Sequence, residues 1–465
     1  MKMLRHVGLG CLNGRILSIS RPSIIPLSAR SIHHVPSSGR RQEPSVSPLP
    51  AAAAKDPAGW MMLNSYGAIR TADTSVSDPN TIAETHTSTD RHLRVFFGRT
   101  SPPASTFVYY NLPDTKPGEE DGDELYVSVL AAHGESVLLE VSSGSEDEHF
   151  LYRVAGAARP PSLTLLPARD FLTKSEKGFV PYIHPPIQPT LHSGSTGLLR
   201  RGDGDDLLVQ LQFMFDREAQ QDVAELCLLR LGTPRWDLME PVPIVYDQDF
   251  EKGDTMLWLS RGNDTALSVG ERFLCLFGYE RGFYLCDLAD EASPKVQFVP
   301  LPPDVMNRCG DDSDDDDRKI SKNMGAAGSS AVRYVSVDVH CCCGGPGRST
   351  CVGSRYAFTI NSWIMDLCSI DNEPLTWVKD GEIDCEELWA LPGYEGLPRA
   401  DVQCPVVSLD DPDIVCFLVS NYEFVSYEDY KVWMIQLNVK TKTLLSVVQF
   451  AKEPWRAYYH FPAKL

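Results

Sequence analysis

Strand-length apolar runs alternate with turn residues along most of the chain after residue 60. Residues 283–288, for example, form one apolar run, and residues 296–302 form the next after a polar turn. Runs of about four to eight residues rich in Val, Leu, Tyr, Phe and Trp, bounded by Gly, Asp or Pro, are typical of β-strands. A helical period is scarce, and residues 384–391 are the best short candidate. The pattern therefore predicts an all-β domain over residues 60–465.

A pair of neighbouring apolar runs recurs along this domain. One or two further strand candidates precede each copy; those before the fourth copy are residues 332–339 and 355–360. Four antiparallel strands per unit, repeated around a ring, form the blades of a β-propeller. Five such pairs are visible: 150–154 with 163–168, 226–231 with 236–242, 283–288 with 296–302, 363–367 with 376–383, and 432–439 with 443–450.

A sixth blade is predicted to be composite. Residues 93–98 and 106–112 lie near the start of the domain, and we expect them to pair with residues 457–461 near its end. Such pairing joins the two ends of the domain and protects strand edges that would otherwise associate with other chains. Two β-sandwiches remain the alternative fold, because turns every 8–12 residues or so are typical of sandwiches too.

The first 42 residues have a different composition from the rest. They carry seven Lys or Arg and no acidic residue, and the first acidic residue of the chain is Glu43. An Arg-rich, Ser-rich and acid-poor N-terminus is typical of an organelle transit peptide. We expect import into mitochondria, because arginine is the main basic residue of this segment, and the chloroplast is the alternative organelle. Residues 43–59, which are rich in Pro and Ala, are predicted to be a disordered linker.

Net charge narrows the range of partners. The chain has 63 Asp and Glu against 43 Lys and Arg, a formal net charge of −20. Nucleic-acid affinity comes largely from Lys and Arg that displace counterions from phosphates, so nucleic acid is a poor candidate. No apolar run approaches the roughly 18 residues of a membrane span. A protein is therefore the expected partner, and the oligomeric state stays open.

The densest charge of the chain lies in an aspartate run at positions 311–317. An EF-hand needs oxygen ligands at fixed alternating positions, a central Gly and a distal Glu, and this run lacks that frame. Repelling carboxylates without apolar neighbours are typical of a solvated segment. The sequence predicts a disordered acidic insert near residues 309–330.

One cluster has the residue types of a metal site. His340, Cys341, Cys343 and Cys351 supply imidazole and thiolate groups, which suit zinc or copper(I). Adjacent side chains of an extended chain point to opposite sides, however, so consecutive cysteines cannot all reach one ion. We interpret the cluster as part of a Gly-rich loop, and metal binding stays open. The other cysteines lie mostly inside apolar runs, where thiols act as small buried hydrophobes. No cofactor is predicted.

No catalytic signature is present in the sequence. His184 and His192 flank a Pro-rich stretch, and with Glu176 or Asp170 they could form an acid–base pair. Their separation and the prolines favour a connecting loop. A Gly-x-Ser-x-Gly elbow and a His-Glu-x-x-His motif are both missing. No catalytic residue is therefore assigned.

Three stretches together resemble a known family. Residues 60–76, 282–304 and 333–339 are similar to the plant domain of unknown function 1618 family, which is expanded in grasses. The resemblance covers most of residues 60–465 and implies a plant origin. It implies no site residues, because the family has no established activity. Its strand pattern is similar to that of propeller-like domains behind F-boxes, although the Leu-Pro-x-Asp opening of an F-box is missing here.

These observations leave three functional hypotheses. The favoured one is a non-enzymatic scaffold that offers a rigid surface to protein partners. The second is an organellar enzyme whose site lies in the propeller channel and is built from residues distant in sequence. The third is a substrate-recognition adaptor related to F-box-associated domains. A fold does not determine function, so the choice depends on the surface that the fold creates.

Overall fold

A computed structural model describes the part of the chain that begins at Gly59. The residues before Gly59, including the leader and nearly all of the 43–59 linker, lie outside it, and so does the aspartate run. The described residues belong to one compact unit, Lys55–Leu465. They are 59–70, 79–98, 100–112, 125–143, 146–156, 159–179, 189–202, 206–246, 265–278, 281–306, 321–341, 356–371, 374–421, 431–450 and 460–464.

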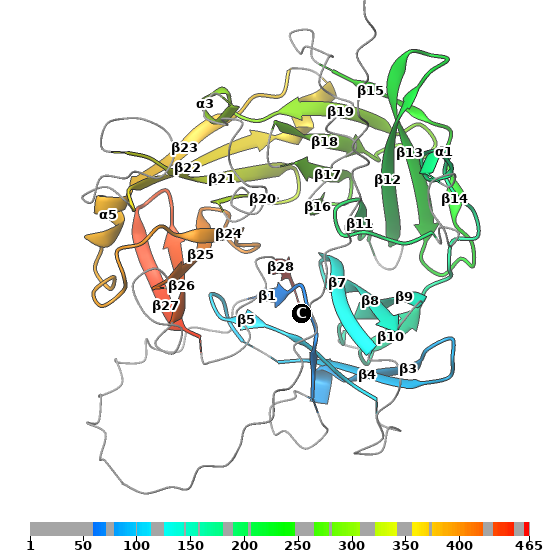
Figure 1. The fold of residues 1–465 in the computed structure, drawn as a ribbon, viewed down its shortest axis with the longest axis horizontal. Helices are drawn as coiled ribbons and strands as arrows, with labels where there is room; N and C mark the ends of the chain where they lie inside the picture. The colour runs from blue at the N-terminus through cyan, green and yellow to red at the C-terminus, as the bar shows by residue number, and fades with distance from the viewer. Residues whose placement is uncertain are drawn as a thin grey trace, which may run out of the picture. The chain divides into compact units, whose positions relative to one another are not determined.

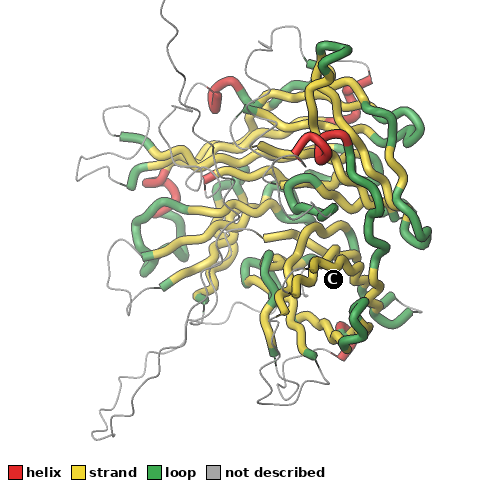
Figure 2. Tube along the Cα trace, turned by 45° about the vertical axis from the view of Figure 1, so that its right-hand side comes forward, coloured by secondary structure: helices red, strands yellow, loops and turns green. Residues whose placement is uncertain are grey.

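Strands make up most of this unit, and the helices are short (Figure 2). Three groups of four consecutive strands form simple antiparallel sheets, which we name blades II, V and VI. Blade II contains β7 (Leu125–His133), β8 (Ser136–Ser143), β9 (Glu146–Arg153) and β10 (Ser162–Leu165). Blade V contains β20 (Lys322–Ala326), β21 (Ala331–Val339), β22 (Phe358–Asp366) and β23 (Val378–Asp384). Blade VI contains β24 (Gln403–Val407), β25 (Ile414–Ser420), β26 (Val432–Asn438) and β27 (Thr443–Gln449).

Blades III and IV are joined into one sheet at their outer strands. Strand β15 pairs antiparallel with β13 and parallel with β19, with Ile244 opposite Val296. Blade III contains β11 (Thr196–Leu199), β12 (Leu207–Asp216), β13 (Gln221–Arg230), β14 (Asp237–Leu238) and β15 (Val242–Val245). Blade IV contains β16 (Thr265–Val269), β17 (Phe273–Gly278), β18 (Gly282–Asp287) and β19 (Lys295–Pro300).

Blade I combines the two ends of the domain, as predicted for a composite blade. It contains two small sheets, in the strand orders β28-β1-β5 and β2-β6-β4-β3, and each has one short parallel pairing, β1 with β5 and β2 with β6. Strand β28 is antiparallel to β1 and lies beside it in Figure 1. The predicted pairing of residues 93–98 and 106–112 with the C-terminal strand is therefore wrong in its partners, because β4 and β6 belong to a separate sheet with β2 and β3. The members are β1 (Met61–Asn64), β2 (Ala68–Ile69), β3 (Ala83–His86), β4 (His92–Phe97), β5 (Ser105–Thr106), β6 (Val108–Asn111) and β28 (His460–Ala463).

The six blades form a closed cycle. The strand at one edge of each blade contacts its counterparts in the two neighbouring blades, in the order β28, β7, β11, β16, β20, β24 and back to β28. Each of six apolar clusters is shared by two consecutive blades. Representative members are Val95 and Leu139, Leu138 and Leu229, Leu226 and Leu276, Phe277 and Tyr334, Val337 and Phe417, and Met62 and Cys416. The propeller-like prediction is confirmed, and the two-sandwich alternative does not hold.

The structure corrects the end of the predicted acidic insert. Residues 322–326, which the sequence assigned to a disordered insert near 309–330, form β20 at the inner edge of blade V. Met324 is buried in the cluster between blades IV and V. A second correction follows in the same blade, since residues 355–360 and 363–367 are not separate strands. Strand β22 runs without interruption from Phe358 to Asp366.

The predicted helix near residues 384–391 is confirmed as α5 (Cys385–Trp389). Asp384 caps it by accepting a hydrogen bond from the Glu386 amide at 2.9 Å. The Asp384 amide in turn donates to the Glu387 carboxylate at 3.2 Å, which completes a capping box. The other helices are α1 (Lys174–Phe179), α3 (Pro303–Met306) and two 3-10 turns at Pro79–Thr81 and Leu367–Asp371. Within the described residues, no helix has the length and apolar character of a membrane span.

Candidate functional site

The residues nominated as metal ligands are only partly described. His340 follows β21, where its backbone amide donates to the Ala357 carbonyl at 3.0 Å. Its Nε2 lies 3.9 Å from the Asp384 carboxylate, and Cys341 is half-buried next to it. Cys343 and Cys351 lie outside the described residues. In the part of the chain that is described, no group of three or more His, Cys, Asp or Glu side chains is arranged to hold a metal ion.

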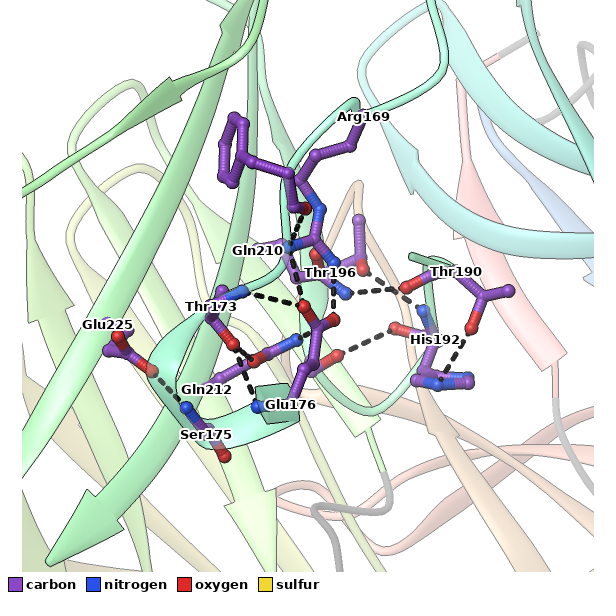
Figure 3. A network of polar contacts seen from close by, with 12 residues as sticks. Arg169, Thr173, Ser175, Glu176, Thr190, His192, Thr196, Gln210, Gln212 and Glu225 are labelled. Carbon is purple, nitrogen blue, oxygen red and sulfur yellow. Dashed lines mark hydrogen bonds and ion pairs between the residues drawn. The ribbon is translucent and has the colours of Figure 1, made fainter. Parts of the chain in front are cut away.

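Glu176 of α1 belongs to an ion-pair network rather than to an acid–base pair. Its carboxylate accepts hydrogen bonds from Arg169 Nη1 at 2.8 Å and from Gln212 Nε2 at 2.7 Å (Figure 3). Burial raises the pKa of Glu176, but the hydrogen bonds from Arg169, the Thr173 amide and Gln212 outweigh it and hold the pKa below its usual range. Such a carboxylate stays ionised and is poorly suited to exchange protons at neutral pH.

The histidines nominated with Glu176 do not complete a pair with it. In Figure 3 the His192 side chain points toward Thr190, and its Nε2 lies 3.2 Å from the Thr190 hydroxyl. Asp170 is exposed, and His184 lies outside the described residues. The geometry therefore fits the connecting-loop interpretation of this segment.

A buried carboxylate fastens α1 to blade III. Glu225 of β13 is 1% exposed and accepts hydrogen bonds from the amides of Lys174 at 2.9 Å and Ser175 at 2.7 Å (Figure 3). The amides at the start of a helix have no partner within it, so a side-chain acceptor stabilises them. This contact holds the segment around Arg169 and Glu176 against β12 and β13.

Blade II carries a polar row across three adjacent strands. Ser128, Glu140 and His149 lie opposite one another in register on β7, β8 and β9. The Ser128 hydroxyl donates to Glu140 Oε1 at 3.3 Å, and His149 Nε2 lies 3.6 Å from Glu140 Oε2. In nucleophilic triads a histidine stands between the hydroxyl and the carboxylate. Here the carboxylate is central, so Ser128 has no adjacent base and the row lacks that chemistry.

Two exposed tyrosines flank this row, and we call them the tyrosine face. Tyr66 forms an isolated antiparallel bridge with Ser128, although the two are far apart in sequence. Tyr126 precedes Ser128 by two positions, and side chains two residues apart on a strand point to the same face. Tyr66 is 62% exposed and Tyr126 is 43% exposed. No pattern in the sequence indicates this pairing, because it depends on how blades I and II meet.

A small charged recess lies between blades II and III. It has a volume of about 20 Å³, roughly that needed by one water molecule. Arg153 Nη2 donates to Asp206 Oδ2 at 2.8 Å, and Arg200 Nη1 donates to Glu135 Oε2 at 2.8 Å. Arg159 completes the charged lining. These residues come from separate segments, so spacing in the sequence could not indicate the recess.

Comparison with known proteins supports part of the family resemblance. Residues 278–416 match the model of a family described as "Protein of unknown function (DUF1618)". That segment covers the last two strands of blade IV, all of blade V, and β24 with the start of β25 in blade VI. No curated protein matches the chain.

Similar solved structures have remote sequences. The WD40 domain of SCAP from fission yeast is 12% identical, with a TM-score of 0.29 over 81% of this chain and 78% of that one. A protein of unknown function from Dyadobacter fermentans is 11% identical, with a TM-score of 0.27 over 84% of this chain and 100% of that one. At these scores the likeness carries no argument, and the fold assignment depends on the strand pairing.

Proposed function

We propose that the propeller-like domain is a non-enzymatic scaffold that presents its tyrosine face to a protein partner. The observation that carries the proposal is the pairing that places Tyr66 and Tyr126 together, 62% and 43% exposed, on rigid strands. Tyrosine is enriched at protein interfaces because its ring supplies apolar area and its hydroxyl keeps a hydrogen-bonding group. Burying such a side chain contributes about 1.5–3 kcal/mol.

Two further properties of the molecule support a scaffold. Glu176 and Glu140, carboxylates in the candidate site, are each engaged in structural contacts. The net charge of −20 disfavours nucleic acid as the partner. A protein surface with basic or aromatic side chains is the complementary partner, because cations are attracted to both the acidic domain and the faces of tyrosine rings.

Site-specific photo-crosslinking tests the proposal. A benzophenone amino acid placed at Tyr66 is expected to capture a defined partner from an extract of the source organism. The matched control carries the same group at Val378, which is 58% exposed on β23 of blade V. The Tyr126→Ser change should reduce capture from position 66. Equal capture at both positions, or no effect of Tyr126→Ser, would contradict the role of the tyrosine face. Recovery of ubiquitin-ligase subunits would instead favour the adaptor hypothesis.

We further propose a plant origin and import of the protein into mitochondria. The family resemblance supports the first, and the seven basic and no acidic residues of positions 1–42 support the second. Residues 1–58 fused to a fluorescent protein should direct it to mitochondria, whereas chloroplast fluorescence would favour the alternative address. Changing Arg5, Arg15 and Arg21 to Gln should abolish import. A cytosolic wild-type fusion would contradict the proposal.

A further inference from the structure

Three of the seven residues that line the recess between blades II and III are arginines. Arg153 ends β9, Arg159 follows it in the connection toward β10, and Arg200 follows β11. Two carboxylates, Glu135 and Asp206, share the recess. The charged side chains therefore sum locally to a single positive charge, in a chain whose net charge is −20.

Most guanidinium donors in the recess have no partner among the described residues. A guanidinium carries five N–H donors. Within the described residues, the Arg153 side chain donates through one nitrogen to Asp206, and the Arg200 side chain donates through one nitrogen to Glu135. The Arg159 side chain is exposed and makes no hydrogen bond or ion pair with any described residue. The recess thus has hydrogen-bond donors from three arginines.

The two carboxylates do not prevent an anion from reaching the arginines. The Asp206 side chain is only 3% exposed, so an incoming group meets Arg153, at 31%, in front of it. The Glu135 carboxylate is half-exposed and is already neutralised by Arg200. The backbone beside Arg200 is fixed as well, because its amide donates to His133 Nδ1 at 3.0 Å. Burial lowers the pKa of His133 to about 4, so this acceptor is uncharged at neutral pH.

We propose that this recess binds a phosphate group. A planar carboxylate is satisfied by the fork of one guanidinium, whereas three guanidiniums that line one recess suit a tetrahedral oxyanion, which accepts more hydrogen bonds. The volume of about 20 Å³ admits a single oxygen atom, so the remaining oxygens face the arginines at the mouth. The exposed mouth leaves room for a phosphomonoester as well as free phosphate. The site is separate from the tyrosine face and does not depend on the scaffold proposal.

Isothermal titration calorimetry of the full chain in chloride buffer tests this assignment. Inorganic phosphate and glycerol 2-phosphate are titrated at constant ionic strength, with acetate as the planar oxyanion. We expect saturable binding of phosphate, and a much weaker response to acetate. Similar affinities for the two phosphate probes would show that the recess takes a phosphomonoester; binding of inorganic phosphate alone would limit the site to the free ion. Absence of saturable phosphate binding would overturn the proposal.

Two variants that each remove one positive charge locate the binding. Arg159→Gln should raise the dissociation constant for phosphate about tenfold, because charge-assisted hydrogen bonds are lost. Arg217→Gln changes an exposed arginine in the turn between β12 and β13 and should leave the affinity unchanged. Thermal unfolding confirms that both variants fold, and Arg200→Gln serves as a second recess variant. Equal affinities of Arg159→Gln and Arg217→Gln would place the phosphate elsewhere and overturn the proposal.

Discussion

Leu63 of β1 lies opposite Phe461 of β28, so strands from the two ends of the domain pair within blade I. The next position of β28, Pro462, lies opposite Met62, and Ala463 is fully buried in the cluster between blades I and II. This pairing closes the cycle of six blades. Radial repetition of this kind leaves only short, protected strand edges.

Closure predicts a strong effect of charge at Ala463. Ala463→Asp places an unpaired carboxylate in an apolar cluster, and we expect it to lower the free energy of unfolding by about 3 kcal/mol or more. Lys464→Asp changes the exposed neighbour and should shift stability by less than about 0.5 kcal/mol. Urea denaturation followed by tryptophan fluorescence measures both. Equal stabilities of the two variants would contradict the closure.

A buried arginine links blades V and VI. Arg333 is 1% exposed and donates to Asp380 of its own blade through two bonds of 2.8 Å, and to Asp413 of blade VI at 2.6 Å. Arg333→Met should cost about 3 kcal/mol, because it leaves two partly buried carboxylates without their partner. Lys440→Met, which removes an exposed lysine 3.7 Å from Asp413, should cost less than about 0.5 kcal/mol. Denaturant titration compares them, and a small effect at Arg333 would contradict this account.

Two deletions of equal length test the corrected boundary of the acidic insert. Removing residues 311–320, which precede the described segment, should shift the melting temperature by only a few degrees, because shortening a connection changes loop-closure entropy little. Removing residues 321–330 deletes β20 and its buried Met324, and should abolish cooperative unfolding. Differential scanning calorimetry distinguishes the two. A cooperative transition in the second variant would show that β20 is dispensable.

Two histidines make stability depend on pH. Burial lowers the pKa of His133 and of His460 to about 4, below the 6.5 expected in the unfolded chain. Between these values the unfolded state binds more protons, so the free energy of unfolding falls as the pH drops below about 6.5. At pH 5 the loss is up to about 2 kcal/mol per histidine. Urea titrations at pH 7 and pH 5 measure it.

The histidine assignment has its own control. His133→Gln should reduce the difference in stability between the two pH values, because glutamine does not titrate. The exposed His86→Gln should leave the difference unchanged. The assignment fails if both variants keep the full pH dependence of the wild type.

The sequence predicted the fold where local patterns were strong. The apolar runs of β18 and β26 identified corresponding strands of two blades, and the helical period of residues 384–391 identified α5. One error occurred in blade I, where β28 pairs with β1 instead of β4 or β6, and two occurred in blade V. Strand β22 is a single strand whose polar residues Asn361 and Ser362 are buried, so the apolar pattern was interrupted and one strand was counted as two. With β22 counted as two strands, blade V already had four strands. Strand β20, which contains Lys, Asn and Gly, was therefore assigned to the insert.

The candidate surfaces could not be predicted in the same way. The tyrosine face depends on the bridge between Tyr66 and Ser128, and the recess brings Arg153 and Arg159 of blade II together with Arg200 of blade III. Neither set has a characteristic spacing, because both arise where blades meet. For Glu176 the sequence suggested a site that the structure does not form. Glutamate is a plausible catalytic residue, but this carboxylate accepts a hydrogen bond from Arg169 in an ion pair.

Hydrogen-exchange mass spectrometry of the strand pair β1 and β28 tests the closed ring most directly. In the wild-type protein, amides of Met61–Asn64 and His460–Ala463 should exchange slowly, as paired strands between buried clusters do. In Ala463→Asp both segments should exchange faster together, while the amides of β21 and β22 in blade V keep their protection longer. Rapid exchange of Met61–Asn64 in the folded wild-type protein, or exchange there that is unaffected by Ala463→Asp, would contradict closure of the ring by β28.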